Sequence, residues 1–151
     1  MDDKWVLIDA NTGLHVGWYF WLRVLDEVNR SARYGPPFAL LLLDAETPPG
    51  SSSKLFDEAC GWVPGAIRST DLAGLIGRGQ VGVLLPHQDD EAAKAARDRI
   101  LERLARAGSK AIHWAPRLFC YPADAAEISM LLTGEWPAHL ADGADGASMP
   151  A

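Results

Sequence analysis

The sequence has few of the groups that bind metal ions or close disulfides. It contains only two cysteines, Cys60 and Cys120, and each lies in an apolar stretch. Such surroundings favour buried free thiols in a reducing compartment over a disulfide between the two, although the sequence alone permits both. The four histidines are scattered without the spacing of metal ligands, so no metal site is predicted and no cofactor is expected.

An excess of positive charge and long hydrophobic runs are also absent. With 14 Lys and Arg against 20 Asp and Glu, the formal net charge is -6, which argues against nucleic acid or an anionic membrane surface as a partner. A small anion held by one or two arginines stays compatible with this charge. The longest uncharged apolar run, residues 38–43, is too short to cross a bilayer, and the first ten residues lack the pattern of a signal peptide. We therefore expect a cytoplasmic protein without membrane insertion.

What is present is an ordinary globular composition, 48% hydrophobic and 23% charged in 151 residues. This composition and length predict a single domain over residues 1–135. The low-complexity residues after it, 136–151, are predicted to form a flexible C-terminal tail.

Apolar periodicity predicts the helices of that domain. Helical spacing occurs over residues 17–33, over residues 55–67 with a break at Pro64, over residues 89–107, and after a capping-box pattern at residues 124–127. In the first helix the apolar face comprises Trp18, Trp21, Leu22, Leu25, Val28 and Ala32, with Arg23, Asp26, Glu27 and Arg30 on the other side. Glycines and prolines at 108, 134 and 137 are expected to end the last two helices.

Short apolar runs predict the strands. A strand buried on both faces is expected over residues 38–44, a hairpin over residues 72–76 and 81–85, and a strand over residues 111–121, in which Pro116 indicates a bulge or an edge position. After the first helix the order is β-α-β-β-α-β. Two split βαβ halves of this kind predict an α+β sandwich of ferredoxin-like topology, with a mainly antiparallel sheet and helices on its faces. This order predicts a fold and says nothing of function.

Four segments in one order resemble the GGDEF domains, the diguanylate cyclase family. The motif DANTGL at residues 9–14 resembles the opening D-x-L-T-G-L, and ALLLLDAE at residues 39–46 resembles the first strand with its D-x-D. The stretch RSTDLAGLIGRGQVGVLLP at residues 68–86 is similar to R-x-x-D-L-x-x-R-x-G-G-D-E-F-x-x-L-L-P, and YPADAAEISMLL at residues 121–132 is similar to Y-P-x-D-x-x-x-x-x-L-L. The resemblance implies the nucleotidyl-cyclase palm as the fold.

The signature motif of the family has lost its acids in this sequence. The family joins two GTP molecules with the help of divalent metal held by carboxylates. The five signature positions read Gly-Arg-Gly-Gln-Val at residues 77–81, so the metal-binding acid falls on Gly79 and its essential neighbour on Gln80. The glycine that lets phosphate approach falls on Arg78. Of the metal ligands only Asp44 is kept, and one carboxylate rarely holds Mg²⁺ by itself.

Base recognition is also altered relative to the family. The segment that recognises guanine is shortened and replaced by residues 50–61, and the last helix lacks the phosphate-binding lysine of the family at residues 134–140. Together with the lost acids, these changes predict that the domain is no enzyme. Asp44, Arg78, Gly79 and Gln80 are then vestigial active-site positions with no catalytic residue and no metal among them.

One ligand motif of the family is retained. Arg68 and Asp71 form the R-x-x-D that in many GGDEF domains binds cyclic di-GMP at the inhibitory site. Arginine offers a planar fork of donors to phosphate or guanine, and aspartate can accept from guanine. The two residues can equally pair with each other and only fix the turn. The second arginine that such sites often use is not assigned by the sequence.

Three functions follow from these observations. The first is a catalytically inactive GGDEF-like signalling domain that binds cyclic di-GMP through Arg68 and Asp71 and acts through a protein partner or a homo-oligomer. The second is a pure protein-interaction or dimerisation module that binds no nucleotide, for which an exposed group of the six tryptophans would be the surface. The third is a residual nucleotide-binding enzyme that uses Asp44.

Overall fold

The computed structural model describes residues 7–107 and 111–135 as a layered α+β domain. The elements follow one another as β1 (His15–Val16), α1 (Gly17–Tyr34), β2 (Phe38–Glu46), α2 (Ser53–Cys60), the 3-10 turn η2 (Pro64–Ala66), β3 (Leu72–Gly77), β4 (Gln80–Pro86), α3 (Asp90–Ala107), β5 (His113–Tyr121), α4 (Ala125–Met130) and the π turn η3 (Leu131–Glu135). None of the helices in this described part is long and apolar enough to cross a bilayer.

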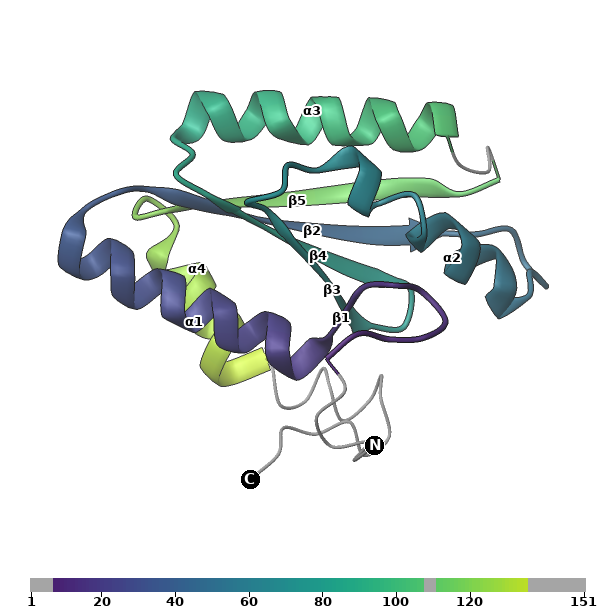
Figure 1. Ribbon diagram of the computed structural model, residues 1–151, viewed down its shortest axis with the longest axis horizontal. Coiled ribbons are helices and arrows are strands. Elements are labelled where there is room, and N and C mark those ends of the chain that lie inside the picture. The colour runs from purple at the N-terminus through teal and green to yellow at the C-terminus, as the bar shows by residue number, and fades with distance from the viewer. Residues whose placement is uncertain (1–6, 108–110, 136–151) are drawn as a thin grey trace.

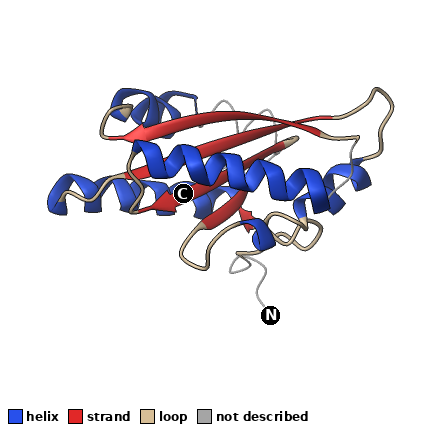
Figure 2. Ribbon diagram, turned by 90° about the horizontal axis from the view of Figure 1, so that it is seen from above, coloured by secondary structure: helices blue, strands red, loops and turns tan. Residues whose placement is uncertain are grey.

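The sheet has the strand order β1-β3-β4-β2-β5. Its pairs are antiparallel except for β1 with β3, which are parallel. Figure 1 shows α3 above this sheet and α1 with α4 below it, and from above in Figure 2 α3 lies over the strands. The ferredoxin-like topology with helices on both faces is therefore confirmed.

Strand β2, which lies between β4 and β5, is apolar from Phe38 to Leu43 because helices cover both faces of the sheet there. Leu41 and Leu43 pack with residues of α2 and α3, whereas Leu40 and Leu42 pack with residues of α1 and α4. Side chains of a strand alternate between the two faces of its sheet, so a strand covered twice needs a continuous apolar run. The prediction from that run is confirmed.

Most predicted elements occur close to their expected bounds. The break at Pro64 is confirmed, because α2 ends at Cys60 and only the short turn η2 follows. Pro116 lies on β5, an outer strand of the sheet, so the edge position is the correct alternative. The expected tail and the stops at residues 108 and 137 lie outside the described residues.

Two details of the last helix were predicted wrongly. The Asp124 side chain accepts a hydrogen bond from the backbone N–H of Cys120 at 2.8 Å and makes no cap to its own helix. The carboxylate therefore ties α4 back to the end of β5. Gly134 does not stop the chain from winding, since η3 continues to Glu135.

The face that α1 turns to the sheet also differs from the prediction. Its buried residues are Phe20, Trp21, Val24, Glu27 and Ser31, whereas Leu22, Leu25 and Ala32 are exposed. Apolar residues occupy more than half of the circumference of this helix, so periodicity did not decide which part faces inward. Glu27, expected on the polar side, is 4% exposed, and its Oε2 has no hydrogen-bond partner among the described residues.

Two glycines of the sheet make room for α1. Gly74 of β3 and Gly82 of β4 lie directly opposite each other. A β-carbon on Gly74 would lie 2.5 Å from Cβ of Phe20, and one on Gly82 would lie 2.7 Å from Cε2 and Cζ of the same ring. The ring of Phe20 thus occupies a notch that any larger residue would fill.

Both cysteines are free and buried, as expected. Burial is the main cause that raises the pKa of Cys60 to about 12 and that of Cys120 to about 11. At neutral pH the thiols are therefore protonated, and a protonated thiol is a poor nucleophile and a poor metal ligand.

Candidate functional site

The turn between β3 and β4 stands where the signature motif of the family is expected. Gly77 and Gln80 face each other across the hairpin, and Arg78 and Gly79 form the turn. Gly79 has a φ of 65°, which glycine adopts without strain. Its carbonyl accepts the N–H of Ala45 at 2.7 Å, so the turn is fixed against the end of β2.

Asp44, at this end of β2, is held by two neighbouring strands. Its Oδ1 accepts from the Nε2 amide of Gln80 on β4 at 2.6 Å. Its Oδ2 lies 3.3 Å from Nε of Arg117 on β5. The carboxylate therefore has a neutral donor on one oxygen and a cation on the other.

These surroundings do not fit a magnesium site. Mg²⁺ needs several oxygen ligands around it, and one oxygen of Asp44 already faces the guanidinium of Arg117, whose positive charge would repel a metal ion. Among residues 7–107 and 111–135 there is no group of three or more His, Cys, Asp or Glu that could hold a metal ion. Arg117 was not singled out from the sequence, because it lies opposite Leu42, two residues before Asp44, and that placement depends on the register of β2 and β5.

A cleft of about 810 Å³ opens beside the hairpin turn. Its walls come from the start of α1, from α2 with the loop before it, and from the turn itself, and they include Trp18, Ser52, Phe56, Asp57 and Arg78. Of the two carboxylates on the wall, that of Asp9 already accepts from the backbone N–H and the hydroxyl of Thr12 at 2.9 and 2.8 Å. This bonding forms an Asx-type turn before β1 and leaves the cleft largely apolar.

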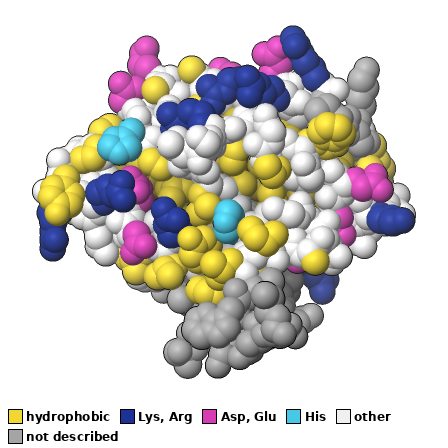
Figure 3. Space-filling model, viewed as in Figure 1, with side chains coloured by type: hydrophobic (Ala, Val, Ile, Leu, Met, Phe, Trp, Pro, Cys, Tyr) yellow, Lys and Arg dark blue, Asp and Glu magenta, His cyan; other side chains and the backbone are white. Residues whose placement is uncertain are grey.

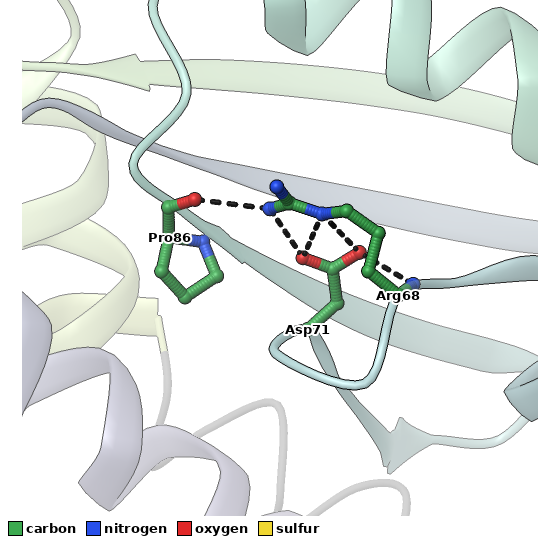
Figure 4. Close-up of polar contacts among 3 residues, drawn as sticks. All are labelled: Arg68, Asp71 and Pro86. Carbon is green, nitrogen blue, oxygen red and sulfur yellow. Dashed lines mark hydrogen bonds and ion pairs between the residues drawn. The ribbon is translucent and has the colours of Figure 1, made fainter.

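Arg68 and Asp71 are joined to each other at the loop that leads into β3 (Figure 4). Asp71 accepts Nη2 of Arg68 at 2.7 Å, Nε at 3.1 Å and the backbone N–H of Arg68 at 2.9 Å. The side chain of Asp71 is fully buried, whereas that of Arg68 is 40% exposed. These hydrogen bonds raise the pKa of Arg68 above its ordinary value.

The other face of the Arg68 guanidinium contacts the end of β4. Nη2 donates to the carbonyl of Pro86 at 3.0 Å. The amide of buried Gln88, oriented so that both of its ends are satisfied, accepts from Nη1 at 2.9 Å and donates to the carbonyl of Ala92 at 3.0 Å. Arg68 thus joins the loop before β3 to the start of α3. Binding of a ligand by the Arg68–Asp71 pair stays a prediction.

Arg99 on α3 is a second arginine with a buried donor group. Nη2 of Arg99 is buried and has no hydrogen-bond partner within the described ranges. Sequence reasoning did not single out Arg99, because the burial of its Nη2 depends on how α3 packs in the fold.

Comparison with solved structures identifies the fold. The FimX GGDEF domain of Pseudomonas aeruginosa superposes with a TM-score of 0.69 at 15% identity, covering 91% of this chain and 93% of that chain. A sensory box/GGDEF family protein of Caulobacter crescentus CB15 gives 0.68 at 19% identity, covering 91% and 100%. The GGDEF domain of DgcB from Caulobacter crescentus, in complex with c-di-GMP, gives 0.68 at 10% identity, covering 86% and 90%.

The chain therefore has the fold of a GGDEF diguanylate cyclase domain, and the resemblance found in its motifs is confirmed at the level of the fold. No family model matches the sequence, and no curated protein is similar to it. The identities are low enough that they establish the fold alone.

Proposed function

We propose that this chain is a GGDEF-type signalling domain that works by binding and has no diguanylate cyclase activity. The observation that carries the proposal is the environment of Asp44. Its carboxylate is engaged by Gln80 and Arg117, and the adjoining turn offers no second acid. Two phosphate groups brought together without metal would repel each other, and the turn supplies no acid to hold the metal that would offset that repulsion.

A turnover assay tests this proposal. The protein incubated with GTP and either Mg²⁺ or Mn²⁺ is expected to form no cyclic di-GMP above a protein-free blank, while an active GGDEF domain in parallel does. Product that appears with this protein and disappears in Asp44→Ala would overturn the proposal. The Asp44→Ala comparison excludes a contaminating cyclase, because a contaminant would be unaffected by the substitution.

Cyclic di-GMP is the ligand that we propose for the signalling role, with Arg68 as its first contact. The guanidinium plane of Arg68 is fixed by Asp71 and is partly open to solvent, so an anion could be bound without further ordering of the side chain. Arg99 is a candidate for the second arginine. The DgcB domain, which shares the fold, was crystallised in complex with c-di-GMP. The buried Asp71 then holds Arg68 and does not itself contact the base.

Titration calorimetry with cyclic di-GMP checks this assignment. Micromolar binding is expected, weakened at least tenfold by Arg68→Lys and by Arg99→Ala, because a lysine lacks the planar fork. Arg106→Ala is the matched control, since Arg106 is an exposed arginine of α3 that pairs only with Glu102 among the described residues. Absence of heat at high micromolar ligand, with the protein folded, removes cyclic di-GMP and leaves the pure interaction module.

A further inference from the structure

An unexpected row of side chains lies on the outer flank of α1. Trp18, Leu22, Leu25, Asn29 and Ala32 follow one another at spacings of four, three, four and three residues. Leu22 and Leu25 are 39% and 44% exposed, Asn29 and Ala32 are exposed, and Trp18 is half-buried. We call these five residues the α1 seam. Hydrophobic side chains gather over α1 on the face drawn in Figure 3, among acidic and basic ones.

The α1 seam has the pattern of a helix that pairs with another helix. Alternating spacings of four and three place side chains on one narrow line, and apolar residues on such a line pack against an equivalent line. The core of the domain uses this line only at Trp18, which packs in part against the cluster that holds Phe20 and Val24. The other four residues of the seam are exposed. One polar residue, Asn29, interrupts the seam, as in helix pairs whose register is fixed by a single polar position.

We propose that the α1 seam binds the same seam of a second copy of this chain, with the two helices antiparallel. A two-fold axis then brings Leu22 of each copy against Leu25 of the other. The same register brings Trp18 against Asn29, so an indole N–H meets an amide oxygen. Every position of the seam from Trp18 to Asn29 therefore has a complementary partner.

Charges beside the seam favour the antiparallel orientation. Asp26 follows Leu25 on one flank of the seam, is exposed, and makes no ion pair within the described ranges. On the same flank Arg23 donates to the hydroxyl of Tyr19 at 3.1 Å, and its guanidinium lies 5.9 Å from the ring centroid. In the antiparallel register, Asp26 of one copy meets the Tyr19–Arg23 pair of the other. In a parallel pair Asp26 would face Trp21, which is buried in the core.

The inference rests on the proposed function and names the α1 seam as the surface through which the domain binds a protein. Its test uses no nucleotide, so its failure leaves the proposed lack of catalysis untouched. The 18 residues of α1 span about 27 Å, which limits the contact to the small end of protein interfaces. A weak, concentration-dependent dimer is therefore expected.

Sedimentation velocity over a range of protein concentrations measures the dimer directly. The protein is expected to dimerise with a dissociation constant on the order of 10–100 µM, and Leu25→Glu is expected to raise that constant at least tenfold. Tyr34→Glu is the matched control, because Tyr34 is 72% exposed on the same helix but lies off the seam. Both positions are exposed, so both variants should melt at the temperature of the wild type.

The orientation has its own test. Asp26→Arg is expected to weaken the dimer, and adding Arg23→Asp to it is expected to restore most of the affinity, because the two charges then exchange places across the axis. A protein that stays monomeric at all concentrations overturns the proposal. A dimer that Leu25→Glu leaves intact also overturns it, and a dimer that ignores the charge exchange overturns the antiparallel arrangement.

Discussion

Replacing Arg68 by alanine is expected to lower the free energy of unfolding by about 2–4 kcal/mol. The substitution leaves the carboxylate of Asp71, whose side chain is fully buried, with only the backbone N–H of residue 68 as a donor. It also removes the donors to Pro86 and Gln88 at the end of β4. A buried charge that has lost its partner is costly because it can neither reach water nor find another donor.

Arg68 and Asp71 differ in burial, and this difference provides a control for the prediction. Asp71→Ala is expected to cost less, about 1–2 kcal/mol, because the partly exposed Arg68 can turn into solvent. The double variant Arg68→Ala/Asp71→Ala should then be more stable than Arg68→Ala alone. Urea unfolding followed by circular dichroism measures all three. Equal costs for the two single substitutions would contradict the assigned role of Asp71 as the buried partner.

Replacing Gly74 by alanine is expected to destabilise the domain by about 1–3 kcal/mol or to prevent folding. The added methyl group would lie 2.5 Å from Cβ of Phe20, an atom whose position is set by the backbone of α1. Gly82→Ala is expected to be less harmful. Its methyl group meets Cε2 and Cζ at the far end of the same ring, which can shift more easily.

A substitution at Phe20 distinguishes the effect of Gly74→Ala from that of Gly82→Ala. Phe20→Val removes the end of the ring and keeps Cβ, so it should relieve the strain of Gly82→Ala and leave that of Gly74→Ala in place. Gly65→Ala serves as the control, since an added β-carbon there meets nothing within 4 Å and the residue is not at positive φ. Thermal melts of the single and double variants test this. Equal rescue of both glycine variants by Phe20→Val would show that the notch is wrongly described.

The fold could be predicted from the sequence where both faces of an element have the same kind of neighbours. The apolar run of β2 allowed one interpretation because both of its faces are covered, and the glycine-containing turn before Val81 fixed the hairpin. The first helix was harder. Its apolar residues cover more than one side, and nothing local shows that Glu27 faces the sheet while Leu25 faces outward. That choice depends on the notch at Gly74 and Gly82, which lies far along the chain.

The candidate site likewise has some features that the sequence predicts and others that depend on how distant elements pack. The absence of acids from residues 77–81 is readable from the sequence, and the mutual pairing of Arg68 and Asp71 was one of two alternatives that it left open. The contacts of Arg117 with Asp44 could not be predicted, because they follow from the register between distant strands. Arg99 was missed for a similar reason, since helix packing decides its neighbours.

The ion pair between Arg117 and Asp44 has a consequence for how this domain responds to divalent ions. A counter-ion that is part of the polypeptide is not diluted by dialysis and is not removed by a chelator. We therefore expect the hairpin tip to keep the same conformation whether or not divalent ions are supplied in the surrounding fluid.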